Sequence, residues 1–242
     1  MKFKIITSVF ILFIMHAVFA TTWGISKAKD PISGQTIKVQ SINSYGSYIY
    51  RWPSKYDGIF WPMTSPNYIR FNPASGYIAF GSDFEKINKD EIDRVSKLLK
   101  KNYDKSKAPK THIEKVKWAQ KVYKARGADE EMQIKFYCLL SYLTRNDKKE
   151  SNKYKQKALD KINKYLKIAK PSDHRGHLYI VAGFYSSLLK SETDAAKYWD
   201  SPETFNVGKS KHAKNSQKYL KELLDSIKNG KYKKIYFGQS PE

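Results

Sequence analysis

The hydrophobic pattern changes its period near residue 86, and this change constrains the fold more than any other feature of the sequence. Residues 21–85 hold short runs in which apolar and polar residues alternate, as in QTIKVQSI and GSYIYRW, interrupted by Pro, Asn and Gly. Alternation with a period of two is typical of half-buried strands. From residue 86 the apolar residues recur at helical spacing instead. We therefore expect an α+β chain that is mostly α, with a β-module over 21–85 and a helical domain over 86–242.

The helical part is expected to form an array of antiparallel helices joined by short connections. The helices are indicated by capping signals at Asn88, Thr111, Asp129 and Asp147 and by apolar stripes over 178–189, 192–199 and 213–227. Each stripe is one-sided, so neighbouring helices should stack. Gly183, Ala195 and Trp199 match the small, small and aromatic packing positions of a tetratricopeptide (TPR) helix pair. The sequence therefore predicts a TPR-like array with loose repeats.

The first twenty residues have the layout of a secretory signal peptide. Lys2 and Lys4 precede an apolar run, and Val18-Phe19-Ala20 provides a small-x-small cleavage signal before Thr21. The apolar run is shorter than the roughly 20 residues that a membrane-spanning helix needs. We therefore expect cleavage near Ala20-Thr21 and a mature chain that is periplasmic or secreted, without a transmembrane segment.

Positive charge is concentrated in the helical part. The net charge is +22, with six basic and four acidic residues in 21–85 against 37 basic and 19 acidic residues in 86–242. Such a field favours anionic partners, although lysine-rich helix faces are also ordinary solvated surfaces. Residues 21–85 instead carry 13 aromatic residues, most of which we expect to form a core or a face packed against the helices. The alternative is an aromatic surface that binds sugar or peptide.

Two pentapeptides in the β-module, DPISG at 30–34 and NPASG at 72–76, share one frame. Proline sets φ for a tight turn, and glycine takes a position with positive φ. With cysteine at the first and fourth positions, each would be the Cys-Pro-x-Cys-Gly knuckle of a zinc ribbon, in which two such pairs bind one metal ion. The ligand positions here hold Asp30, Ser33, Asn72 and Ser75, and the frame is kept by Pro31, Gly34, Pro73 and Gly76.

On these residues the chain resembles a bacterial domain-of-unknown-function family that joins a double-knuckle zinc ribbon to a TPR-like helical region. The segment FNPASGYIAFGSDFEKI at 71–87 carries the resemblance most strongly, and WGISKAKDPISGQ and YIYRWPSKYDGIFWP fit the segments before and between the knuckles. The resemblance spans essentially the whole mature chain and implies a ribbon-like β-module before the helices. Because all four ligand positions differ, the chain looks like a secreted member that has lost its cysteines.

The residues at the four ligand positions predict a turn pair without metal. One carboxylate, one amide and two hydroxyls are too weakly charged a set for Zn²⁺ and sparse for Ca²⁺, so we expect no metal and no other cofactor. Asp and Asn side chains accept hydrogen bonds from backbone N–H groups two residues on, and Ser does so more weakly. We therefore expect the two turns to face each other, with oxygen atoms accepting the hydrogen bonds that sulfur accepts in a zinc knuckle.

No pattern in the sequence is typical of catalysis. A Gly-rich phosphate loop, a nucleophile elbow and an HExxH motif are all missing. His174 and His177 have i,i+3 spacing, but only Asp173 accompanies them, so we interpret Asp173 as a helix cap and the histidines as exposed. Cys138 lies on an apolar helix face and is expected to be buried. We predict no catalytic residues and a chain that is not an enzyme.

The expected function is protein–protein interaction or scaffolding in the cell envelope, through the helical array. The alternative is electrostatic binding of anionic envelope polymers through the lysine-rich faces of 97–126, 148–170 and 209–234. The lysine runs KLLKK and KYKQKALDK lack the interleaved aromatic residues and arginine that nucleic-acid grooves favour. An exported protein also has no access to genomic DNA, so nucleic acid is not an expected partner.

Overall fold

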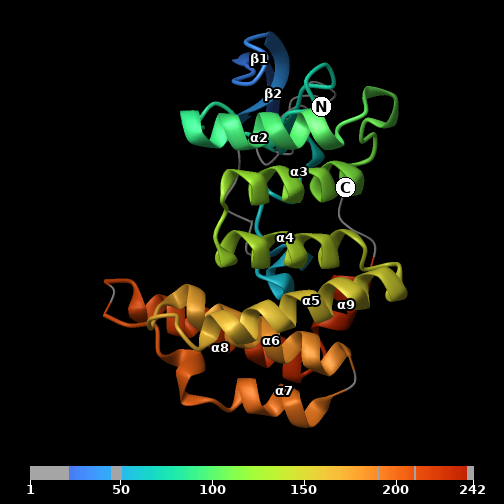
Figure 1. Ribbon diagram of the computed structural model, residues 1–242. Helices are drawn as coiled ribbons and strands as arrows, with labels where there is room; N and C mark the ends of the chain where they lie inside the picture. Colours follow the sequence, from blue (N-terminus) through green and yellow to red (C-terminus); the bar gives the residue numbers. More distant parts are fainter. Residues whose placement is uncertain (1–21, 45–50, 190, 210, 239–242) are drawn as a thin grey trace, which may run out of the picture.

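The computed structural model describes residues 22–44, 51–189, 191–209 and 211–238, and the expected signal peptide lies outside them. Within these residues the chain is α+β and mostly helical, with eight α-helices and two antiparallel sheets of two strands each (Figure 1). The expected fold class is therefore confirmed at this level. Residues 21–85 supply the strands and residues 86–242 supply the helices.

Both pentapeptides form the turns of β-hairpins. Strand β1 (Thr22–Lys29) pairs with β2 (Thr36–Ser44), and the register that joins Lys29 to Thr36 leaves 30–35 as the turn. Strand β3 (Ile69–Phe71) pairs with β4 (Ile78–Phe80), and the pair of Phe71 with Ile78 leaves 72–77 as the turn. The expected strand in QTIKVQSI is confirmed as β2.

The other expected strand, GSYIYRW, is not seen among the described residues. Residues 45–50 lie outside them, and the chain then enters the 3-10 helix η3 (Pro53–Asp57). A second 3-10 helix, η4 (Pro66–Tyr68), precedes β3. Proline at the first helical position favours a helical turn in both places, because its fixed φ suits a helix start.

Eight helices follow. Their bounds are α2 (Lys89–Asn102), α3 (His112–Arg126), α4 (Glu130–Leu143), α5 (Lys148–Leu166), α6 (Asp173–Leu188), α7 (Glu192–Trp199), α8 (Ala213–Lys228) and α9 (Tyr232–Phe237). Short 3-10 helices, η5 (Lys105–Lys107) and η6 (Pro202–Phe205), lie in two of the connections.

The capping signals in the sequence mark the starts of α2 to α5 correctly. Asn88 and Thr111 form complete capping boxes with Glu91 and Glu114. Asp129 accepts a hydrogen bond from the backbone of the first turn of α4, and Asp147 does the same at α5. Two expectations are wrong: α6 begins at Asp173 rather than at 178, and α9 has no counterpart in the sequence prediction.

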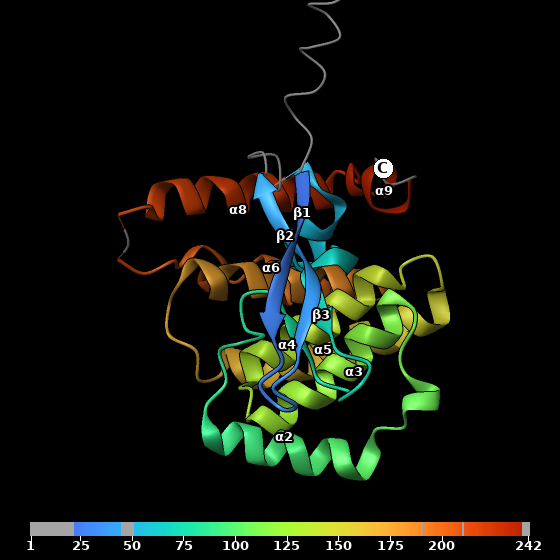
Figure 2. The same ribbon diagram turned by 90° about the horizontal axis from the view of Figure 1, so that it is seen from above.

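The helices stack in chain order. In Figure 1, α2 to α7 follow one another down the molecule, and each packs against the next. Seen from above in Figure 2, α8 and α9 lie along one edge of the molecule, and the β1–β2 hairpin crosses the top of the stack between that edge and α2. This arrangement places the turn of the first hairpin beside α2.

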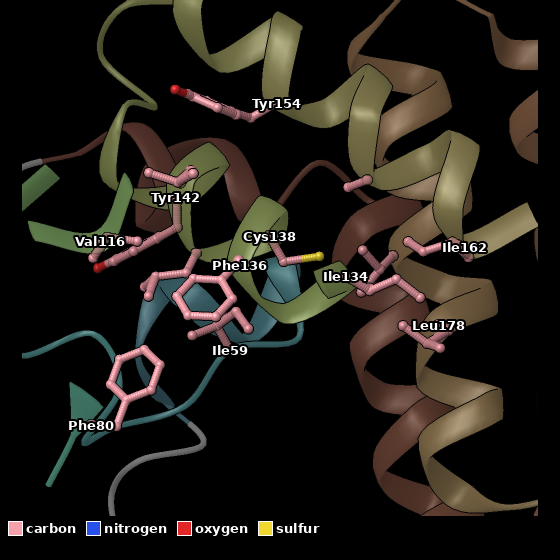
Figure 3. Close-up of a cluster of buried hydrophobic side chains, with 14 of the residues drawn as sticks. Ile59, Phe80, Val116, Ile134, Phe136, Cys138, Tyr142, Tyr154, Ile162 and Leu178 are labelled. Atoms are coloured by element: carbon pink, nitrogen blue, oxygen red, sulfur yellow. The ribbon is translucent and has the colours of Figure 1, made fainter. Parts of the chain in front are cut away.

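One hydrophobic cluster includes side chains from both parts of the chain. Phe80 of β4 lies 5.6 Å from the Phe136 ring and 5.7 Å from the Tyr123 ring, measured between centroids. Figure 3 shows Phe80 and Phe136 close to Ile59 in this cluster. Cys138 also belongs to it and is 2% exposed, as expected for a buried cysteine. Side chains of 21–85 and of 86–242 share this cluster. The division of the chain into two separate domains at residue 86 therefore stays a prediction.

Candidate functional site

The two pentapeptide turns have the same backbone hydrogen bonds. The Gly34 amide donates to the Asp30 carbonyl over 2.8 Å, and the Gly76 amide donates to the Asn72 carbonyl over 2.8 Å. Gly34 and Gly76 have φ values of 72° and 82°, in the left-handed region that glycine adopts without a steric penalty. Pro31 stands at the second position of the first turn, as Pro73 does in the second. The shared Pro and Gly frame thus produces one turn conformation twice.

Side-chain oxygen atoms accept the backbone N–H groups inside each turn. Asp30 Oδ1 accepts from the Ile32 amide at 2.8 Å, and Asn72 Oδ1 accepts from the Ala74 amide at 2.9 Å. Ser75 Oγ accepts from the Tyr77 amide at 3.1 Å, and Ser33 Oγ is 3.4 Å from the Gln35 amide. The first and fourth residues of each turn therefore play the same role in both turns.

The two turns face each other, and Asp30 joins them. Its Oδ2 atom accepts from Asn72 Nδ2 at 2.5 Å and from Ser75 Oγ at 2.5 Å, both in the other turn. It also accepts from Ser33 Oγ at 2.9 Å. Ser33, Asn72 and Ser75 thus converge on one carboxylate oxygen of Asp30, and hydrogen bonds to a charged acceptor are stronger than neutral ones.

Asp30 is fully buried, and Asn72 is 2% exposed. Burial alone would raise the pKa of the Asp30 carboxyl, but the hydrogen bonds from Ser75, the Ile32 amide, Asn72 and Ser33 outweigh it and leave this pKa lowered. The carboxylate therefore stays ionised at neutral pH and keeps all of its acceptor positions.

The second turn is bound to the helical part by two aromatic side chains. Tyr103, at the end of α2, donates from its hydroxyl to the Pro73 carbonyl at 2.6 Å. Trp118 of α3 donates from Nε1 to the Gly76 carbonyl at 2.7 Å. These bonds use backbone acceptors that the turn itself leaves open, so the turn pair attaches the hairpins to α2 and α3.

The turn pair offers little to a cation. Asp30 contributes the single carboxylate of the four positions, and Asn72 presents its amide nitrogen rather than its oxygen to the centre. Within the part of the chain that the structure describes, no group of three or more His, Cys, Asp or Glu side chains has a spacing suited to a metal ion. The arrangement is structural chemistry rather than catalytic chemistry.

A second candidate site is a lysine-rich surface on α3, α4 and α5. We define the basic face by Lys117, Lys121, Lys124, Lys153, Lys157 and Lys161 together with the rings of Trp118, Tyr137 and Tyr154. The lysines recur every three or four residues on α3 and on α5, so each set lies on one side of its helix. Lys121, Lys124, Lys153 and Lys157 are exposed, whereas Lys117 and Lys161 are half-buried and paired with Glu150 and Glu130.

Lysines of the basic face lie over aromatic rings, several of which belong to a neighbouring helix. The Nζ atom of Lys117 on α3 lies 5.6 Å from the centroid of the Tyr154 ring on α5. Lys157 on α5 lies 5.8 Å from the Tyr137 ring on α4, and Lys121 lies 5.7 Å from Trp118 on its own helix. These distances are within the range of cation–π attraction.

The sequence runs KLLKK and KYKQKALDK contain few rings, and the expectation that nucleic acid is not a partner stays a prediction. Helix stacking nevertheless places Lys117 and Lys157 of the basic face over rings of α5 and α4. A single-chain pattern does not reveal this, because the partners are 20 to 37 residues apart in the sequence.

Two hollows lie side by side along the basic face. One, of about 630 Å³, is lined by Tyr103, Trp118, Lys117 and Lys121 among others. The other, of about 400 Å³, is lined by Lys121, Lys124, Lys161 and Tyr137 among others. Lys121 belongs to both, so the hollows adjoin at this residue of α3.

The histidine pair is placed differently from the prediction. Ser172 rather than Asp173 caps α6, because its side chain accepts from the Arg175 amide at 3.1 Å. His174 and His177 are half-buried and not exposed, because Phe60 and α8 cover this end of α6. Burial lowers the pKa of His174, and it lowers the pKa of His177 to about 4, so His177 is neutral at physiological pH.

A buried polar cluster surrounds Asp57, the last residue of η3, and nothing in the sequence singled it out. Asp57 is 1% exposed, and its Oδ1 atom accepts from the hydroxyls of Tyr185 at 2.6 Å and Tyr236 at 3.1 Å. Lys155 is also buried and donates to Ser151. Burial raises the pKa of Asp57 to about 6, against the lowering effect of Tyr185 and Lys155.

No family of proteins is shown for this chain. No protein-family model, no curated protein and no solved structure matches it. Every helix among the described residues is too short or too polar to span a bilayer.

Proposed function

We propose that this chain is a non-enzymatic binding protein that acts in the periplasm or outside the cell and holds an anionic polymer against the basic face. The observation that carries the proposal is the set of lysines placed over aromatic rings of neighbouring helices, beside two adjoining hollows. Ammonium groups attract carboxylate or phosphate, and the half-buried rings of Trp118 and Tyr137, which line the hollows, offer apolar surface to sugar units. A helix face that carries lysines without aromatic rings is usually only a solvated surface.

The extent of the basic face favours a polymer over a small anion. It crosses three successive helices, from Lys117 on α3 through Tyr137 on α4 to Lys157 on α5. A small anion would occupy one hollow, whereas a chain of charged sugar units can lie along both. Some lysines are already paired within the protein, as Lys117 is with Glu150 at 2.9 Å, so binding depends on the sum of several contacts.

The experiment is a titration of the mature chain with polygalacturonate, followed by calorimetry at several salt concentrations, with neutral dextran as the comparison polymer. We expect binding to polygalacturonate alone, with affinity that falls steeply as salt rises, because binding releases counterions from the polymer. The variant Lys121→Gln/Lys124→Gln/Lys157→Gln should bind weakly. In a plot of log affinity against log salt concentration, this variant should give a slope whose magnitude is smaller by about two, because each lost contact contributes roughly 0.7.

A matched control removes the same charge elsewhere. Lys97, Lys100 and Lys101 lie exposed on α2, outside both hollows. Their triple change to glutamine should leave affinity within about twofold of the wild type. Equal weakening by both triple variants, or equal binding of dextran, would show that the basic face is not the binding site.

Protein interaction through the helical stack is the second candidate function. Support comes from the close packing of α6 on α7, where the indole of Trp199 fills the space beside Gly183 and a methyl group on Gly183 would overlap it. A small residue under an aromatic ring is the packing of a TPR helix pair, and the TPR-like description is part of this proposal. A protein partner held by apolar contacts would survive salt that removes polygalacturonate, so the same titration separates the two functions.

We also propose that the turn pair descends from a zinc ribbon of the family that the sequence resembles. The support is the equivalence of the two turns and the convergence of Asp30, Ser33, Asn72 and Ser75 on one point. In an oxidising compartment four thiols risk mispairing, whereas hydrogen-bonded oxygen atoms do not.

A further inference from the structure

Two adjoining cavities lie beside the first turns of α6, away from the basic face. The outer one is a cleft of about 550 Å³ against the N-terminal half of α8, lined by Phe60, Asp173, His174, His177, Ser216 and Tyr219 among others. This volume is typical of small-molecule sites. The inner one is a more enclosed pocket of about 150 Å³. Phe60, His174 and His177 line both cavities, so the two adjoin at these residues.

The inner pocket is largely apolar. Its walls include Ile59, Ile134, Leu178 and Val181, from the segment after η3, from α4 and from α6. Asp57 also lines it, with its Oδ1 atom bonded to the hydroxyls of Tyr185 and Tyr236. An apolar cavity of about 150 Å³ accommodates a benzene ring in an engineered protein. The inner pocket therefore has the size and chemistry for one aromatic or branched aliphatic group.

Aromatic rings flank His177 where the outer cleft and the inner pocket adjoin. Its ring centroid lies 5.7 Å from that of Phe60 and 5.8 Å from that of Tyr219, both in edge-to-face orientation. Its Nε2 atom lies 3.1 Å from the Lys55 carbonyl and donates to it, because a carbonyl only accepts. That bond fixes the ring, and the depressed pKa of His177 keeps it uncharged.

The charge of the outer cleft contrasts with the rest of the chain. In a protein with 45 Lys and Arg residues, the described lining of this cleft contains neither, and Asp173 is its charged member. The lysines of α8 that are nearest in sequence, Lys214 and Lys218, line a different hollow. Lys135 lines the inner pocket, but its Nζ atom is paired with Glu131 at 2.7 Å. An exposed carboxylate beside aromatic rings attracts a cation.

We propose that these two adjoining cavities together bind a small organic amine with one aromatic or branched aliphatic group. The apolar group occupies the inner pocket, and the ammonium group lies in the outer cleft near Asp173 and the rings of Phe60 and Tyr219. The site is distinct from the basic face, which repels a cation, so it adds a second ligand class to the proposed function.

The test uses three probes of nearly equal shape and different charge: benzylamine, benzyl alcohol and benzoate. Titration of the mature chain, followed by ligand-observed NMR, should give the affinity order amine, alcohol, acid. Benzylamine should bind at least about tenfold more tightly than benzoate. Equal affinities for the three probes, or no binding of benzylamine at millimolar concentration, would overturn the proposal.

Two variants locate the charge recognition. Asp173→Asn should remove the preference for benzylamine over benzyl alcohol while leaving the alcohol bound, because Asp173 is exposed and only its charge is lost. Asp160→Asn, an exposed carboxylate on α5, should keep that preference. An unchanged preference in Asp173→Asn would contradict the assigned position of the ammonium group.

The inner pocket is tested from the ligand side and from the protein side. A benzylamine with a tert-butyl group on the ring exceeds a benzene-sized pocket, so it should bind at least tenfold more weakly than benzylamine. Val181→Phe should fill the pocket and weaken benzylamine to a similar extent. The ligand series decides the matter if this variant does not fold, and equal binding of the larger amine would refute the pocket assignment.

Discussion

At the scale of single residues, Asp30 and Asp57 show what sequence can and cannot reveal about buried carboxylates. Asp30 stands in a repeated pentapeptide, and its meeting with Asn72 and Ser75 was expected from the repeat and is observed. Asp57 has no such context. Its partners Tyr185 and Tyr236 lie 128 and 179 residues away. A lone Asp in SKYDG gives no sign of burial, because that depends on elements far along the chain.

The raised pKa of Asp57 predicts a measurable effect of pH on stability. Because its folded-state pKa of about 6 lies above the ordinary value, the stability linked to this proton is complete below about pH 4 and is lost as pH rises through 6. Asp57→Asn removes this titration but keeps an oxygen acceptor for the two tyrosine hydroxyls. Its free energy of unfolding, minus that of the wild type, should rise by on the order of 2 kcal/mol between pH 4.5 and 7.5.

Urea unfolding of both proteins at several pH values measures this difference. The subtraction cancels the opposite contribution of His112 and His177, whose lowered pKa values stabilise the fold as pH rises. A flat difference for Asp57→Asn would mean that Asp57 is already ionised at acid pH.

At the scale of elements, helix starts with capping residues were predictable and helices made by tertiary contacts were not. The capping boxes of α2 and α3 are local, so the sequence indicates them directly. The six-residue α9 lacks a capping side chain, and it packs through Tyr236 against Asp57 and Phe184. The aromatic contacts of the basic face also depend on neighbouring helices, which explains why sequence runs did not reveal them.

The two turns offer a matched pair of glycine substitutions at this scale. Both glycines have positive φ, but a methyl group on Gly34 meets no neighbouring atom within 4 Å, whereas one on Gly76 would overlap the Tyr103 ring. Gly34→Ala should therefore cost about 1–2 kcal/mol, from backbone strain alone. Gly76→Ala should cost about 1–3 kcal/mol more, because it also displaces the turn from α2.

Urea unfolding of the two glycine variants measures both costs against the wild type. Because both glycines have positive φ, the two variants carry the same kind of backbone strain. The difference between their losses of unfolding free energy therefore reports the contact with Tyr103. Equal costs would indicate that the second turn does not pack against α2.

At the scale of the whole molecule, the division into a β part and a helical part and the packing of one on the other were predictable, but the contacts of their shared core were not. The period change near residue 86 marks where strands give way to helices. It says nothing of how Phe80 packs between Tyr123 and Phe136, or how Tyr56 packs against Phe184. Such contacts join distant segments, and they make the hairpins, the turn pair and the helical stack one packed unit.

We propose that hydrogen bonds to Asp30, rather than a metal ion, hold the turn pair together, while Tyr103 and Trp118 fix it to the helices. The most direct measurement is urea unfolding of the wild type and of Asp30→Ala, each with and without EDTA. We predict that EDTA changes neither curve and that Asp30→Ala lowers the free energy of unfolding by about 3 kcal/mol or more, because it strands buried donors of Asn72 and Ser75. A wild type that EDTA destabilises, or an Asp30→Ala variant as stable as the wild type, would contradict the account.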